Sequence, residues 1–137
     1  MNHWRAIYAA YQASPYFLYY KHELEFIFRN KHKLLFDLNL EITKKLCQII
    51  GIKTQINITE EFVKQGSQKN DHRFDISPKV NPTIENFPAY VQVFSDRHGF
   101  IKNLSILDLL FNLGPDTLNY LKSIGKYIET TDQPVES

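Results

Sequence analysis

Two polar residues interrupt the most apolar run of the sequence. Ser105 and Asp108 lie three positions apart within the stretch from Leu104 to Phe111. A Ser-x-x-Asp pattern at the start of an apolar helix is typical of a capping box, in which each side chain satisfies an amide at the helix start. The same groups could instead serve a ligand or catalytic site. The pattern favours capping for the pair and leaves substrate binding by Asp108 open.

Gln92 lies between two aromatic residues at alternate positions of a short segment. If this segment is extended, Tyr90 and Phe94 share a face with Gln92. An amide between two rings suits a sugar, because the amide can hydrogen-bond to hydroxyl groups while the rings pack against the sugar. The alternative is an exposed strand residue without a ligand. Asn103 offers a second carboxamide, either as a helix cap or in a pocket.

Three basic residues could hold an anionic group near these amides. Arginine and lysine side chains bind carboxylates and phosphates, although most surface charges are simply solvated. We expect any ligand site to lie between the loop at residues 73–79 and the segment at residues 90–108. No catalytic residue is identified, and the predicted substrate-binding residues are Arg73, Lys79, Tyr90, Gln92, Arg97, Asn103 and Asp108.

Most familiar catalytic signatures are absent from the sequence. There is no phosphate-binding loop, no GxSxG motif and no zinc-type pairing of histidines, so we expect neither a metal site nor a cofactor. His3 could act as a general base near neutral pH, but its position so near the N-terminus favours a structural or exposed histidine. Cys47 falls between Leu46 and Gln48 in a helical pattern, which indicates a packed or idle thiol. The histidines are at positions 3, 22, 32, 72 and 98.

Composition and charge narrow the class of protein. A net charge of +1, from 16 basic and 15 acidic residues, lacks the basic excess that is typical of nucleic-acid binding. No apolar run approaches the ~20 residues that span a bilayer, and no signal peptide is recognisable. A single cysteine suits a reducing compartment. We therefore expect a cytoplasmic protein with no membrane span that binds no nucleic acid.

Helical periodicity covers most of the chain. Apolar residues recur at steps of three or four, which gives a helix one buried face. Gly51 is expected to end one helix, and Gly114-Pro115 to end another and start the last. Ser14 is the predicted N-cap of the second helix. The predicted helices cover residues 2–13, 15–29, 31–50, 104–111 and the stretch after Pro115.

A period of two replaces the helical period after Gly51. The alternation from Ile52 to Ile58 predicts a strand with one buried face. Its partner is either the segment Tyr90–Phe94, itself extended or one turn of helix, or a strand outside this chain. An unpaired strand would lead the chain to form a homo-oligomer or to expose apolar surface.

These elements predict a mainly α (α+β) fold. We expect a helical bundle-like domain with one or two short strands, a polar loop at residues 64–72 and a Pro-rich irregular segment at residues 73–89. Aromatic residues make up 14% of the sequence, so the core should be rich in rings. One domain is predicted to cover residues 1–129, followed by a polar tail at residues 130–137.

Three stretches resemble the WbqC-like protein family. The third is the most specific, and the resemblance covers nearly the whole chain. The stretches are His3-Trp4-Arg5-Ala6-Ile7 with Ala10-Tyr11 and Ser14-Pro15-Tyr16-Phe17; Ile76-Ser77-Pro78-Lys79; and Tyr90-Val91-Gln92-Val93-Phe94, His98-Gly99-Phe100, the run from Asn103 to Asn112, and Gly114-Pro115.

The resemblance implies a role in the synthesis of bacterial surface polysaccharide, the O-antigen. For this family it suggests transfer of glycine or another acyl or amino-acid group to a sugar, with an activated sugar or other small molecule as substrate. The alternative is a non-catalytic accessory module that binds a partner protein or a glycan intermediate. Similar proteins carry a further segment before the His-Trp motif, so the chain is expected to be the C-terminal part of such a protein.

Overall fold

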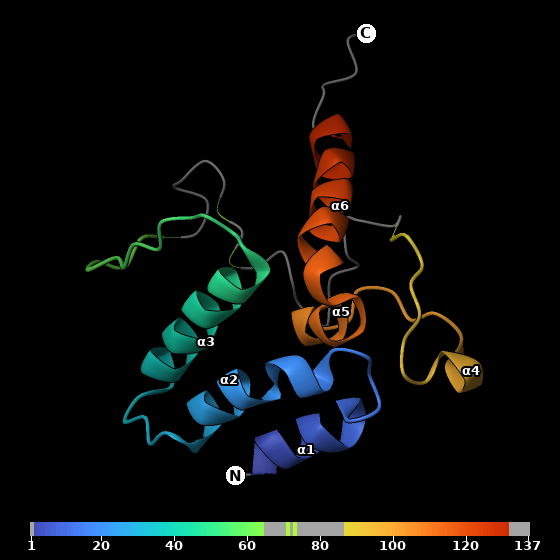
Figure 1. Ribbon diagram of the computed structural model, residues 1–137. Helices are drawn as coiled ribbons and strands as arrows, with labels where there is room; N and C mark the ends of the chain where they lie inside the picture. Colours follow the sequence, from blue (N-terminus) through green and yellow to red (C-terminus); the bar gives the residue numbers. More distant parts are fainter. Residues whose placement is uncertain (1, 65–70, 72, 74–86, 132–137) are drawn as a thin grey trace, which may run out of the picture.

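The protein is described by a computed structural model, which places residues 2–64, 71, 73 and 87–131. This part of the chain is predominantly helical (Figure 1). Its helices are α1 (Asn2–Tyr11), α2 (Phe17–Arg29), α3 (Leu35–Ile50), the single turn α4 (Ser95–His98), α5 (Ile106–Leu113), the 3₁₀ turn η1 (Gly114–Asp116) and α6 (Thr117–Thr131).

The helices pack around α2 and α5. In Figure 1, α1 and α2 form an antiparallel pair, and α3 contacts α2. Helix α5 packs on α2 from above in this view, and α6 extends upward from α5. The centre of the core is an edge-on contact between Phe17 of α2 and Phe111 of α5, both fully buried, with ring centroids 5.1 Å apart. Trp4 of α1 stacks on Phe17 at 6.1 Å. The prediction of a core rich in rings is confirmed for this part of the chain.

The turn between α1 and α2 differs from its prediction. Ser14 is not the N-cap of α2, because Tyr16 occupies that position without a capping side chain. The Ser14 hydroxyl instead donates to the carbonyl of Tyr11, and the Ser14 N–H donates to the same carbonyl at 2.9 Å. Ser14 therefore satisfies the C-terminal end of α1 rather than the start of α2.

Both predicted glycine stops are confirmed. Gly51 ends α3 with a φ of 84°, and its N–H donates to the carbonyls of Cys47 and Gln48. Gly114 follows α5 with a φ of 55°, and η1 then leads into α6. A β-carbon at Gly114 would lie 2.5 Å from the ring of Tyr16, so this position also needs glycine for close packing.

The strand prediction is not confirmed. Within the described ranges no strand forms, and the segment Ile52–Ile58 is extended without a ladder. A lone extended segment cannot pair its own backbone groups, and no neighbouring strand is present in the described part to pair with it. The segment Tyr90–Phe94 is irregular and ends in the turn that starts α4. The α+β part of the predicted fold class is therefore unsupported, while its mainly helical part holds.

Large apolar side chains remain exposed on the described part of the chain. Several lie on α2 and at the start of α3, and others follow the extended segment. Examples are Leu18, Tyr19, Phe26, Leu35, Phe36 and Phe62. Exposed apolar surface was one of the two outcomes expected of an unpaired strand. Self-association, the other outcome, stays a prediction.

No helix within the described ranges has the length and apolar character needed to cross a membrane. Much of the predicted loop at residues 64–72 and of the Pro-rich segment at residues 73–89 lies outside the described residues, as does the polar tail from residue 132 on. The helix α6 extends to Thr131, slightly beyond the predicted start of that tail.

Candidate functional site

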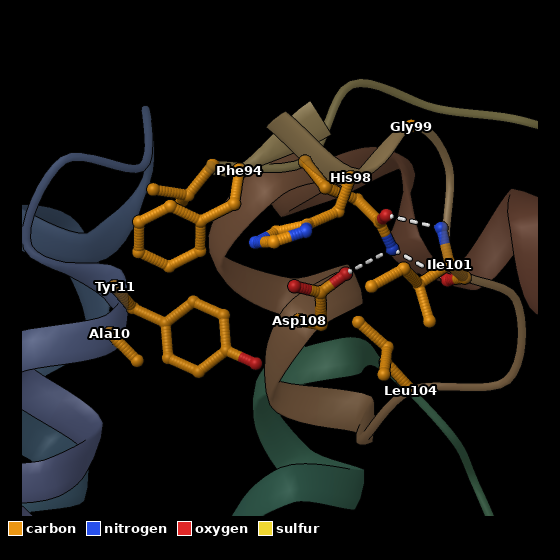
Figure 2. Close-up of a pocket in the computed structure, with 10 residues that line it drawn as sticks. Ala10, Tyr11, Phe94, His98, Gly99, Ile101, Leu104 and Asp108 are labelled. Atoms are coloured by element: carbon orange, nitrogen blue, oxygen red, sulfur yellow. Dashed lines mark hydrogen bonds between the residues drawn. The ribbon is translucent and has the colours of Figure 1, made fainter. Parts of the chain in front are cut away.

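Gln92 is the centre of a buried hydrogen-bond network. Its side-chain amide pairs with the backbone of Ile101 in both directions: Nε2 donates to the Ile101 carbonyl at 2.9 Å, and Oε1 accepts from the Ile101 N–H at 2.9 Å. Nε2 also donates to Oδ2 of Asp108 at 3.0 Å. Only 6% of Gln92 is exposed, so the interpretation as an exposed strand residue is wrong. Gln92 fixes the loop that carries Ile101 to helix α5 (Figure 2).

Asp108 is the acceptor at the base of this network and is only 3% exposed. Its Oδ2 accepts from the Tyr90 hydroxyl as well as from Gln92, and its Oδ1 accepts from Nδ2 of Asn112 at 3.3 Å. Neutral donors thus solvate the carboxylate in place of water. No ion pair with Asp108 is found among the described residues.

The capping-box prediction is half right. Ser105 is the N-cap of α5, and its hydroxyl accepts from the N–H of Leu107 at 3.3 Å. The Asp108 side chain does not return to the helix start, because its oxygens bind Tyr90, Gln92 and Asn112. Only the backbone N–H of Asp108 bonds to Ser105, at the carbonyl, at 2.8 Å. A Ser-x-x-Asp pattern cannot distinguish a capping carboxylate from one that is directed inward.

Two tyrosines face the Asp108 carboxylate and are held in the neutral form. Burial raises the pKa of the Tyr11 phenol to about 12, with the charge of Asp108 and a hydrogen bond to it adding to the effect. Burial also raises the pKa of Tyr90, and its hydrogen bond to Asp108 acts in the same direction. Both phenols are therefore hydrogen-bond donors at physiological pH.

A hollow of about 220 Å³ opens above this network. Helix α1 contributes Tyr11 to one wall, and the segment around α4 contributes Phe94 and His98 to another (Figure 2). Asp108 and Leu104 line it from the side of α5. We call it the His98 hollow, since it brings an imidazole, a phenol and a carboxylate to one small volume. Those groups can exchange or orient protons.

Sequence reasoning missed two residues of this hollow as site candidates. His98 was named only in the motif His98-Gly99-Phe100 and among the histidines without zinc-type pairing, and Tyr11 only within the family resemblance. A signal for His98 was present in Gly99, whose φ of 67° lets the chain turn back after α4. Tyr11 carried no such signal, because nothing local indicates that α1 packs beside a loop from the other end of the chain.

A second hollow of about 350 Å³ shares Leu104 with the His98 hollow. It is lined by Asn103, Leu104 and Tyr120 together with Tyr90, so the predicted residues Tyr90 and Asn103 meet here. Asn103 adopts a φ of 58°, a left-handed conformation that asparagine tolerates better than most residues. The left-handed backbone at position 103 is therefore a sufficient reason for asparagine there, whether or not its amide binds a ligand.

The predicted basic clamp is not assembled in the described part of the chain. The Arg73 guanidinium forms an ion pair with Asp71 at 2.6 Å and donates to the carbonyl of Val63 at 2.9 Å. Arg97 is exposed on α4 and lines neither hollow. Lys79 lies outside the described residues. The structure thus brings Tyr90, Gln92 and Asp108 into contact and leaves Arg73 and Arg97 apart from them.

Among the described residues, no group of three or more His, Cys, Asp or Glu side chains is arranged to hold a metal ion. The closest acid–histidine contact there joins His32 to Glu41, at 2.6 Å between Nε2 and Oε2. This pair ties the connector after α2 to α3 and lies away from both hollows.

Comparison with known proteins gives one relationship. No curated protein and no solved structure matches the chain. A sequence profile of the WbqC-like protein family matches residues 1–85, which is more than half of the 137 residues. The matched region includes Tyr11 and ends before the segment from Tyr90 to Asp108. On this match, the chain belongs to the WbqC-like protein family.

Proposed function

We propose that the chain takes part in the transfer of an acyl or aminoacyl group, such as glycine, to a sugar during synthesis of a bacterial surface polysaccharide (O-antigen) in the cytoplasm. The observation that carries this proposal is the His98 hollow, where His98, Tyr11 and Asp108 line one small volume. Acyl transfer needs a group that accepts a proton from the attacking atom, together with donors that hold the acceptor in place.

His98 is the proposed general base of this reaction. The acceptor nitrogen or oxygen forms a bond to the carbonyl carbon of an activated acyl donor. The bond to the leaving group breaks, with the electron pair departing on that group, and the acceptor's proton moves to the imidazole. Tyr11 stays neutral, because its pKa is raised to about 12; its proton is directed to Asp108, and its oxygen can accept a hydrogen bond from a hydroxyl of the acceptor.

A non-catalytic accessory module is the second candidate, and one observation favours it. A catalytic histidine is usually oriented by a third group. No hydrogen bond joins His98 to Asp108 within the described ranges, and the Asp108 oxygens are already engaged by Tyr90, Gln92 and Asn112. The same hollow would then bind a sugar-containing intermediate without transforming it.

Product formation distinguishes the two candidates. The protein is incubated with an amino sugar and acyl or glycyl thioesters, and products are detected by mass spectrometry. We expect a product whose rate falls in His98→Gln and is retained in His22→Gln, a matched control at an exposed position of α2. Product formation that is unchanged in His98→Gln contradicts the role of His98. Sugar binding without any product, across all thioesters, favours the accessory module.

A further inference from the structure

The charge around the His98 hollow constrains what it can bind. Asp108 carries the only acidic or permanently basic side chain among its lining residues, all of which belong to the described part of the chain. Arg97 and Lys102, the cations next to lining residues in the sequence, are exposed and line no part of it. The negative charge of Asp108 therefore favours a cation in the hollow and opposes a phosphate or carboxylate.

Asp108 itself lacks a counter-charge. Its carboxylate is almost completely removed from water, and the groups of the described residues that donate to it are all neutral: the Tyr11 and Tyr90 hydroxyls and the Gln92 and Asn112 amides. Buried charges in proteins are usually paired with an opposite charge, because neutral donors recover only part of the lost hydration. The hollow is the place where a cation from solvent can approach this carboxylate.

Aromatic rings complete a site for a cation. Phe94 lines the hollow and is 47% exposed, so part of its side chain is accessible to a ligand. Tyr11 lines the hollow from α1, and Figure 2 shows its ring next to that of Phe94, with the Tyr11 hydroxyl directed toward Asp108. An ammonium group between ring faces and a carboxylate gains both cation–π and Coulomb attraction.

We propose that the His98 hollow binds a primary amine, with the ammonium or amino group directed to the side of Asp108 and the adjoining carbon framework against Phe94 and Tyr11. This inference rests on the proposed function and names its acceptor as an amine rather than a hydroxyl. It also departs from the expectation that Arg73, Lys79 and Arg97 could hold an anionic group at this site.

The test compares glucosamine with two sugars that differ from it only at carbon 2 and with one that has a hydroxyl at carbon 2 and a phosphate at carbon 6. Isotope-labelled protein is titrated with glucosamine, glucose, N-acetylglucosamine and glucose 6-phosphate, and amide shifts are recorded by NMR. We expect glucosamine to shift the amides of Gln92, Ile101 and Asp108 and to bind about tenfold or more tightly than the other three, as one charged contact is worth roughly that factor. Added salt should weaken its binding.

Variants separate the charge from the fold. Asp108→Asn keeps the shape of the side chain and should remove the preference for glucosamine over glucose, whereas Asp116→Asn, an exposed acid in η1, should retain it. Because Asp108→Asn could disturb the network, Phe94→Leu provides a second variant at a half-exposed position, with an expected loss of several-fold in glucosamine affinity and an unchanged melting temperature.

Some outcomes overturn the inference directly. Equal binding of glucose and glucosamine, tighter binding of glucose 6-phosphate, or no shift with glucosamine each contradicts an amine site. The proposed function fails separately. If the protein binds amines but transfers no acyl group from any donor, the amine site is supported and the transferase is contradicted. If it transfers an acyl group to hydroxyl acceptors and shows no preference for amines, the amine site is contradicted and the transferase is supported.

Discussion

Replacing Gln92 by Leu tests whether the buried network holds the hollow together. Leucine has a similar volume and suits a buried position, so the change removes the hydrogen bonds with little loss of packing. The bond from Nε2 to the Asp108 carboxylate is worth about 1.5–3 kcal/mol, because its acceptor is charged. The two bonds to the Ile101 backbone add less than the usual ~1 kcal/mol each, since Ile101 is 45% exposed and water can replace the amide.

We therefore expect Gln92→Leu to lower the free energy of unfolding by roughly 2–4 kcal/mol. Urea denaturation followed by far-UV circular dichroism measures this loss, with Gln48→Leu on the exposed side of α3 as the matched control. Amide exchange should also accelerate at Ile101, whose N–H loses its acceptor. A loss below about 0.5 kcal/mol, equal to that expected of a surface substitution, would show that the network does not stabilise the fold.

Further predictions concern the glycine corner, the helix cap and the tyrosines. Gly114→Ala should cost about 2 kcal/mol or more by urea denaturation, because the new β-carbon would lie 2.5 Å from a ring atom and φ is 55°. Gly125→Ala, whose β-carbon meets nothing within 4 Å in α6, should instead stabilise the protein by about 0.5–1 kcal/mol; a cost at both glycines would contradict the steric argument. Ser105→Ala should cost about 0.5–1 kcal/mol in the same assay, and an unchanged midpoint would refute the cap. The pKa of Tyr11 is raised from 10.0 to about 12, so this residue's contribution to stability is complete below pH ~10 and is lost as the pH rises toward 12, because the unfolded phenol ionises first. Tyr11→Phe should flatten that alkaline decline, measured by melting temperature against pH, whereas Tyr19→Phe at an exposed position should not.

The helical part of the fold could be predicted because its signals are local. Steps of three or four between apolar residues, and glycines at the ends, identify α3 and α5 without knowledge of their neighbours. Gly51 and Gly114 adopt the positive φ values that made them stops. The prediction that Ser14 caps α2 failed because a serine hydroxyl can bond either to the end of the preceding helix or to the start of the next. In the structure it donates to the Tyr11 carbonyl at the end of α1.

The strand at Ile52–Ile58 shows where a local pattern is insufficient. Alternation records that one face is apolar, but a strand also needs a second backbone at hydrogen-bonding distance. The described residues supply none, so the segment remains extended and unpaired. The need for a partner strand was already part of the prediction for this segment.

The candidate site was predictable only in part, for a similar reason. Asp108 stood out because it interrupts an apolar run, and Gln92 because it lies between the aromatic residues Tyr90 and Phe94. The structure does bring Tyr90, Gln92 and Asp108 into contact. Their assignment to substrate binding stays a prediction. Tyr11 could not be found, because its partner Asp108 comes from the opposite end of the chain and only tertiary packing brings the two together.

The distant origin of the hollow's walls has a practical consequence for finding its ligand. Tyr11 comes from the first helix, while Phe94, His98 and Asp108 come from the last third of the chain, so no denatured conformer presents them together. A compound that contacts both walls binds only the native state, and at a concentration of 100 times its Kd it adds about 2.7 kcal/mol to the free energy of unfolding. Screening a metabolite collection by the upward shift in melting temperature can therefore reveal the natural ligand before any reaction is known.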